Sequence, residues 1–146
     1  RTLGSPQMPA LTADGRGLFV ADYPQGIYVV DLAHKGAGRW IAKPQSLAST
    51  GLDGLYLYEN RLIGIQNGTF PHRVLEMQLA PDSAQIVDWH VLEQATPDLG
   101  EPNHGVVVGR DFYFIGNSGW DRVGDDGTFK TTADDKAPVL LKLRLD

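Results

Sequence analysis

The chain has 146 residues, 42% of them hydrophobic and 21% charged, which is the balance of an ordinary globular domain. Its formal net charge of -5 comes without a cluster of Lys and Arg, which argues against nucleic acid and anionic lipid as partners. Cysteine is absent, which excludes a disulfide framework and a thiolate metal site. No apolar run approaches the ~18 residues of a membrane span, and 17 Gly and 9 Pro favour short strands over long helices.

The first predicted unit covers about residues 6–45 and has the order strand, tight turn, strand, looser loop, strand. Asp14-Gly15 is a turn signal, and it precedes a nearly all-apolar strand that closes at Asp22. Gly26–Leu32 supplies the third strand, and Arg39–Ala42 is predicted as a fourth, outer strand that carries a Trp.

The second and third units, about 46–96 and 97–146, repeat this order. The strands expected in the second unit are Asp53–Tyr58, Leu62–Asn67, Arg73–Leu79 and the outer Ile86–Leu92. The strands expected in the third are His104–Val108, Phe112–Asn117 and Val139–Leu145, with no outer strand after Leu145.

The three units repeat at the spacing of β-propeller blades. Asp22, Asn67 and Asn117 each close a second strand, and they lie 45 and 50 positions apart. Blades of four strands repeat at roughly 40–50 residues. The prediction is therefore an all-β chain of about eleven strands in about three blades of the four-stranded antiparallel type, the third blade without its outer strand, and with no helix longer than two turns. Three blades do not close a ring, so we expect half of a six-bladed propeller, with the remaining blades on the same or another chain. Without them the first and last blades would expose flat apolar faces, which we expect to include Phe19, Val20, Phe112 and Phe114. The start at Arg1 is taken as an interior point of a longer chain.

In each blade, the start of the first strand and the end of the second strand lie at one end, which circular repetition turns into one rim. Carboxylates, amides and two His converge there, and such oxygen donors suit hard cations. The rim positions are Asp22, Asp53, Gln66, Asn67, Glu101, Asn103, His104 and Asn117, and the adjoining loops add Tyr23, His72, Arg73, Trp120, Asp121 and Arg122.

Each of these candidates also has a structural interpretation. Asp53-Gly54 either caps a strand or faces a ligand, and His104 needs partners to act as a ligand. Asn67-Gly68 and Asn117-Ser118 are turn formers as well as candidate ligand-binding positions. Trp120, on the longest loop, is either a platform for a ligand or the anchor of a lid.

Three segments carry a resemblance to a known family. Gly51–Leu79, Glu101–Arg122 and Ala137–Leu145 resemble the last blades of six-bladed propellers of the SMP-30/gluconolactonase/LRE-like class, in particular a bacterial, often exported subgroup without an assigned activity. The resemblance covers nearly the whole chain and about half of such a propeller.

The resemblance implies a divalent cation, Ca²⁺ or Zn²⁺, held near the axis by Glu, Asn and Asp. Asp53 matches the Asp of the family's "DG" motif and Asn103 loosely matches its Asn, whereas the Glu belongs to an earlier blade. It also implies a periplasmic or secreted location, with the cytoplasm as the alternative.

Three functional hypotheses remain open. The first is a metal-dependent hydrolase of a lactone or related ester, in which Asp53 and Asn103 hold the cation and Glu101 or His104 moves protons. The second is a non-catalytic propeller that binds a small molecule, peptide or partner through Asn67, Arg73, Asn117 and Trp120. The third is a structural module of a larger exported protein. Fold alone does not decide among them.

Overall fold

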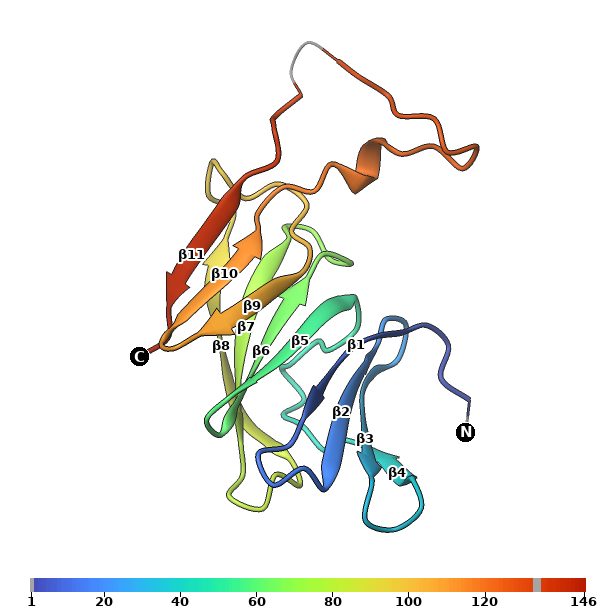
Figure 1. Ribbon diagram of the computed structural model, residues 1–146, viewed down its shortest axis with the longest axis vertical. Helices are drawn as coiled ribbons and strands as arrows, with labels where there is room; N and C mark the ends of the chain where they lie inside the picture. The colour runs from blue at the N-terminus through green and yellow to red at the C-terminus, as the bar shows by residue number, and fades with distance from the viewer. Residues whose placement is uncertain (1, 133–134) are drawn as a thin grey trace.

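The computed structural model describes residues 2–132 and 135–146, and in these the chain is all-β (Figure 1). Eleven strands form three antiparallel sheets, as the sequence predicts. Within the described residues the helical structure is the short 3-10 turn η1 (Trp120–Arg122), which confirms the expectation of no helix longer than two turns. None of the described helical structure has the length and apolar character needed to cross a membrane.

The sheets follow one another along the chain as blades 1, 2 and 3. Blade 1 has the strand order β1 (Pro6–Leu11), β2 (Gly17–Asp22), β3 (Gly26–Asp31) and β4 (Ala37–Trp40). Blade 2 has the order β5 (Leu52–Tyr58), β6 (Arg61–Gln66), β7 (Arg73–Leu79) and β8 (Ile86–Gln94). Blade 3 has three strands, with β10 (Asp111–Ile115) between β9 (Gly105–Val108) and β11 (Leu140–Arg144).

The tight turns form from local chemistry that the sequence already displays. Between β1 and β2, Gly15 takes a φ of +71°, which glycine adopts without strain. The Asp14 carboxylate accepts hydrogen bonds from the Thr12 hydroxyl at 2.6 Å and from the Arg16 N–H at 3.0 Å, which fixes the turn. Between β9 and β10, Gly109 has the equivalent role with a φ of +61°.

The blades stack face to face through their inner strands. β5 packs against β1 and β2 on one side and against β9 on the other. Phe19 and Leu55 are fully buried in the seam between blades 1 and 2. Ile63, Phe112 and Phe114 are fully buried in the seam between blades 2 and 3, where the two phenylalanine rings stack at 5.4 Å. Because each such side chain contributes roughly 1.5–3 kcal/mol on burial, the two seams dominate the stability of the chain.

One prediction about these faces is wrong. The sequence led us to expect that Phe19, Val20, Phe112 and Phe114 lie on the bare outer faces of the terminal blades. Their exposed fractions are 0%, 8%, 0% and 0%. The reason is the strand pleat: Phe19, Phe112 and Phe114 point from β2 and β10 into the seams with blade 2. Hydrophobicity shows that a strand is buried, but not which neighbour buries it.

The outer faces still carry apolar side chains, but other residues supply them. On blade 3, Val106, Val108 and Leu140 are 54%, 57% and 69% exposed, and each alternates along its strand with an inward-facing neighbour. On blade 1, Leu11 is 52% exposed and lies opposite Leu18 in the β1–β2 pair. The outer faces of the two terminal blades therefore carry exposed apolar side chains, and on blade 3 these stand beside charged ones, because Lys142 and Arg144 lie on the same face of β11 as Leu140.

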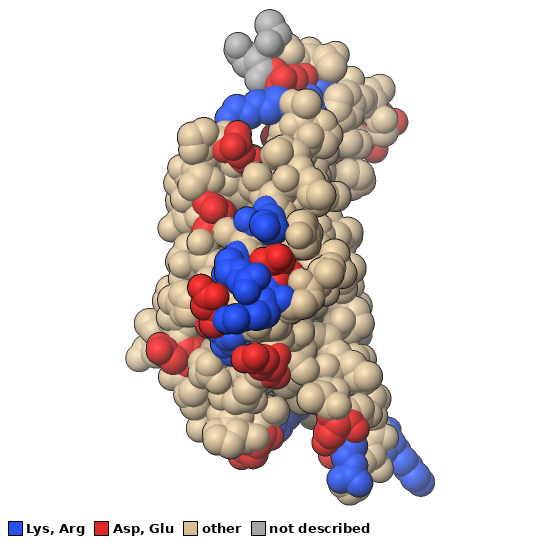
Figure 2. Space-filling view, turned by 60° about the vertical axis from the view of Figure 1, so that its left-hand side comes forward, with Lys and Arg blue, Asp and Glu red and all other residues tan. Residues whose placement is uncertain are grey.

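The exposed face of blade 3 carries mixed charges near the edge strand β11. Lys142 and Arg144 lie within salt-bridge distance of Asp111, at 3.9 and 3.3 Å, and Arg110 and Arg144 both approach Asp146. Figure 2, which brings this side of the molecule forward, shows basic and acidic side chains side by side in one band. Charged side chains on an edge strand oppose unspecific strand pairing.

We predict that the chain alone self-associates in solution, because patches of several hundred Å² are rarely left uncovered on a monomer. Sedimentation velocity should show concentration-dependent association of the wild type. The double variant Val106→Lys/Leu140→Lys should shift it towards monomer, whereas Asp125→Lys/Thr131→Lys, at exposed loop positions, should not. A monomeric wild type with one cooperative unfolding transition would contradict the prediction.

Candidate functional site: the polar rim

Asn67, directly after β6, is the centre of a hydrogen-bond cluster at the rim. Its side-chain Nδ2 donates to Asp53 Oδ2 at 3.0 Å and to the carbonyl of Pro102 at 3.1 Å. Its Oδ1 accepts a hydrogen bond from the Tyr23 hydroxyl at 3.1 Å. Tyr23 lies in the β2–β3 loop, Asp53 in β5 and Pro102 just before β9. One amide thus connects all three blades.

Close packing of backbone holds Tyr23 in this cluster. The Gly51 N–H donates to the Tyr23 carbonyl at 2.7 Å, and the Gly68 N–H donates to the Gly51 carbonyl at 3.0 Å. A Cβ at Gly68 would lie 2.5 Å from the Gly51 Cα and 2.7 Å from the Tyr23 hydroxyl. A glycine at 68 therefore allows the β6–β7 loop to approach Tyr23 so closely.

Two nearby carboxylates contribute to the raised pKa of the Tyr23 hydroxyl. Partial burial raises the pKa of Tyr23, and the negative charges of Asp53 and Glu101 raise this pKa further. Asp53 is held by Asn67, and Glu101 Oε2 accepts a hydrogen bond from the Asp121 N–H at 2.6 Å. The rim therefore combines two half-buried carboxylates, an amide and a phenol from successive blades.

The long β10–β11 loop is attached to the rim through Glu101. Besides the contact to Asp121, the Glu101 carbonyl accepts a hydrogen bond from the Ser118 N–H at 2.8 Å. Trp120, between these two anchor points, is 66% exposed. The structure therefore places Trp120 beside the rim, on a loop that two backbone contacts fix.

Asn103 and His104 lie at the start of blade 3 but do not join the Asn67 cluster. Asn103 Oδ1 accepts a hydrogen bond from the His104 N–H at 2.6 Å, and the Asn103 N–H donates to the Ile115 carbonyl at 2.9 Å. The His104 side chain is exposed. The hydrogen bonds of these two residues thus stabilise the local backbone just before β9.

Arg73 and Asn117 also have partners of their own. Arg73 Nε donates to Gln66 Oε1 at 2.6 Å, its guanidinium lies 5.5 Å from the Trp89 ring, and burial lowers its pKa. Asn117 Nδ2 donates to the Lys136 carbonyl at 3.1 Å within the β10–β11 loop. The two asparagines that end second strands therefore differ: Asn67 joins blades, and Asn117 joins parts of one loop.

Asp22, which corresponds in position to these asparagines, has a structural role. It is fully buried and accepts hydrogen bonds at 2.8 Å from the Gly4 N–H, the Ser5 N–H and Gln25 Nε2. Three donors compensate the loss of hydration of a buried carboxylate. They attach the N-terminal segment to blade 1 and leave Asp22 outside the Asn67 cluster.

The described residues do not form a complete metal site. Among them, no three His, Asp or Glu side chains come together as ligands. Asp53 shares Oδ2 with Asn67, and the Asn103 side-chain oxygen is engaged by backbone. A calcium ion takes about six to eight oxygen ligands. Asp53 and Asn103 alone therefore do not fit the divalent cation that the resemblance implies.

These features define a β-propeller-like fold with a polar rim. A solved structure with this fold is the PQQ-bound aldose sugar dehydrogenase from Streptomyces coelicolor, to which the chain is similar with a TM-score of 0.56 and 13% sequence identity. The match covers 95% of this chain and 42% of the dehydrogenase, so the chain spans less than half of that protein. No protein-family model matches the sequence, and comparison with curated proteins gives no match. The likeness extends to the propeller fold and not to the SMP-30 subgroup.

We predict that Asn67→Ala destabilises the chain by about 1–3 kcal/mol, because it removes three hydrogen bonds and leaves Asp53 and Tyr23 without their partner. Asn117→Ala is the matched control, since it removes one exposed hydrogen bond and should cost about 1 kcal/mol or less. Urea denaturation of both variants measures the difference. Equal losses would show that the Asn67 cluster does not hold the blades together.

We also predict that Asp53→Asn and Glu101→Gln each lower the pKa of Tyr23 towards its ordinary value, because each removes a negative charge. The raised pKa stabilises the fold fully below the unfolded value near 10.0, and this contribution is lost as pH rises through the folded pKa. NMR titration of the Tyr23 ring carbon tests this prediction. A pKa unchanged in both variants would contradict it.

Proposed function

We propose that this chain is part of a β-propeller that binds a small polar ligand at its rim without transforming it. The observation that carries the proposal is the Asn67 cluster, in which Tyr23, Asp53 and Pro102 from three blades meet around one amide. Such convergence of a few polar groups is the usual means by which a site orients its ligand.

The chemistry of the rim favours ligands that donate hydrogen bonds. Asp53 and Glu101 each have one carboxylate oxygen engaged by a protein donor, which leaves the second oxygen of each as an acceptor. The exposed Trp120 adds an apolar surface close to these acceptors. A polyhydroxylated or amine-bearing molecule therefore fits the rim better than an anion.

We further propose that additional blades, on the same or another chain, cover the outer faces of blades 1 and 3. The apolar side chains on both faces support this arrangement, as does the match to 42% of a larger propeller. The periplasmic or secreted location expected from the family resemblance stays a prediction.

A metal-dependent, lactonase-like hydrolase of the SMP-30 class is the second candidate. The nearness of two rim carboxylates, Asp53 and Glu101, to the same phenol favours it. The remaining ligands would have to come from other blades, because the described residues supply no complete set.

A ligand titration tests the binding proposal. Xylitol, a neutral polyol, should perturb the backbone amides of Asn67 and Glu101 in an NMR titration, and the double variant Asp53→Asn/Glu101→Gln should weaken binding at least fivefold. Asp125→Asn, in the exposed part of the β10–β11 loop, is the charge-matched control. Identical binding by the double variant would overturn the assignment of the rim as the site.

Calorimetry with CaCl₂, on the whole protein, tests the hydrolase. We expect that Asp53→Ala abolishes Ca²⁺ binding if Asp53 is a ligand, with the fold intact because the substitution removes one side-chain hydrogen bond, worth about 1 kcal/mol. Hydrolysis of a sugar lactone that depends on Ca²⁺ and on Asp53 would establish the hydrolase. Absence of Ca²⁺ binding by the wild type, or equal binding by Asp53→Ala, would exclude Asp53 as a metal ligand.

A further inference from the structure

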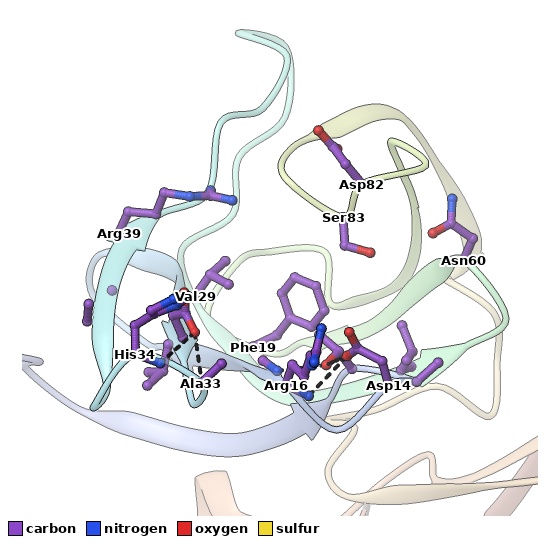
Figure 3. A pocket seen from close by; sticks show the side chains of 18 of the residues that line it. Asp14, Arg16, Phe19, Val29, Ala33, His34, Arg39, Asn60, Asp82 and Ser83 are labelled. Carbon is purple, nitrogen blue, oxygen red and sulfur yellow. Dashed lines mark hydrogen bonds and ion pairs between the residues drawn. The ribbon is translucent and has the colours of Figure 1, made fainter.

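A hollow of about 810 Å³ lies between blades 1 and 2 at the end opposite the rim (Figure 3). Its borders are the tight turns β1–β2, β3–β4, β5–β6 and β7–β8, whereas the rim is formed at the other ends of the strands. Its volume falls in the range of roughly 300–1,000 Å³ that small-molecule sites occupy. None of the Asn67 cluster lines it, so it is independent of the proposed rim site.

The hollow exists because small residues line it on the side of blade 1. Gly17, Ala33, Ala37 and Gly38 fill little of the space between the sheets. Gly17 and Ala37 lie in register with Asp31 on the face of the sheet that also carries Phe19 and Val29. Their small size leaves this end of the wedge between the blades open.

The inner part of the hollow is apolar. Val29 from blade 1 and Leu57 from blade 2, both half-buried, line it together with the fully buried Phe19, and both pack against the core cluster to which Phe19 belongs. Figure 3 shows the Phe19 ring between the Asp14–Arg16 turn on one side and Asp82 and Ser83 on the other. An apolar group about the size of an aromatic ring would fit there, against Phe19 and between the two turns.

The mouth carries carboxylates that are only partly engaged. Asp14 uses Oδ1 to accept from Thr12 and Arg16, and Asp82 uses Oδ1 to accept from the Ala84 N–H at 2.9 Å. Among the described residues, Asp14 Oδ2 and Asp82 Oδ2 make no hydrogen bond. The turns are thus satisfied by one oxygen of each carboxylate, and the other oxygen is available to a ligand.

Glu59 adds a third carboxylate to the mouth, with Oε2 3.3 Å from Arg61 Nη2 and Oε1 without a hydrogen bond among the described residues. In total the lining has four carboxylates, including Asp31, and two guanidinium groups, which leaves two negative charges in excess when His34 is neutral. One of the guanidinium groups, Arg39, already donates to the Ala84 carbonyl at 2.8 Å.

We propose that this hollow is a second binding site, for a small organic cation that has an apolar, aromatic-sized body. The body lies between Val29 and Leu57, and the cationic group lies at the mouth near Asp14, Glu59 and Asp82. Charge complementarity selects the cation, and the apolar floor selects against a small hydrated ion.

Three matched probes separate charge from shape. We expect benzyltrimethylammonium to bind at least tenfold more tightly than benzenesulfonate, which has the same ring and the opposite charge. Tetramethylammonium, which lacks the ring, should bind more weakly than benzyltrimethylammonium. In NMR titrations of the full chain, the amide shifts of Ala13–Arg16 and Asp82–Ala84 should move, and those of Asn67 and Glu101 at the rim should not.

Isosteric substitutions test the carboxylates without disturbing the turns. In Asp14→Asn/Asp82→Asn, the amide Oδ1 still accepts the turn hydrogen bonds, but two negative charges are lost. We expect at least fivefold weaker binding of benzyltrimethylammonium. Asp88→Asn/Asp126→Asn is the control, because both aspartates also accept backbone N–H bonds through Oδ1 but lie outside the hollow.

Glu59→Gln is a second variant, which keeps the test valid if the double variant misfolds. The Glu59 side chain is 69% exposed in a turn, and its substitution should weaken binding at least twofold. Raising the salt concentration should weaken the binding of benzyltrimethylammonium to the wild type, because the carboxylates at the mouth are solvent-accessible. Equal binding of cation and sulfonate, unchanged binding in both carboxylate variants, or shifts at the rim instead of the hollow would overturn the proposal. These outcomes leave the xylitol test of the rim unaffected.

Discussion

Face-to-face packing of the sheets is the interaction on which the rest of this structure depends. β5 packs against blade 1 on one face and against β9 on the other, so blade 2 is covered on both sides. Phe19 fills one seam, and the stacked Phe112 and Phe114 fill the other. Without these seams the apolar faces of each sheet would be exposed to water, and the stabilisation from their burial would be lost.

The packing of the seams also determines where polar chemistry can occur. Apolar side chains occupy the middle of each seam, so polar groups gather at the two ends, where the strands give way to loops and turns. At the rim, Asn67 engages Tyr23, Asp53 and Pro102, and most of its hydrogen-bonding capacity is used between blades. Asn67 therefore both holds the blades in register and positions the carboxylate beside which a ligand would bind.

The two ends of the blades differ in physical character. The rim end is built from loops that contact one another, as Glu101 before β9 does with the long β10–β11 loop. The opposite end is built from tight turns, and in three of them, β1–β2, β3–β4 and β7–β8, an Asp side chain accepts hydrogen bonds from the backbone of its own turn. Because the backbone hydrogen bonds of these turns form within each turn, they need no partner on the next blade, and a hollow remains between the blades.

The strands, the turns and their repetition can be predicted from local and periodic patterns in the sequence. Gly15 and Gly109 mark tight turns, the apolar second strands mark buried positions, and the spacing of Asp22, Asn67 and Asn117 marks the blades. These signals are local or periodic, so they need no knowledge of the fold. They also placed Asp53, Asn67 and Glu101 at one end of the strands, where the structure has them.

The role of each position depends on how the blades pack, which the sequence pattern does not show. Asp22, Asn67 and Asn117 are equivalent in sequence, yet one is buried beneath the N-terminal segment, one joins three blades, and one stays within a loop. The importance of Tyr23 follows from the close approach of Gly51 and Gly68, which are distant from it along the chain. The direction of Phe19 and Phe112 likewise depends on the neighbouring blade, because the pleat offers two faces and packing selects one.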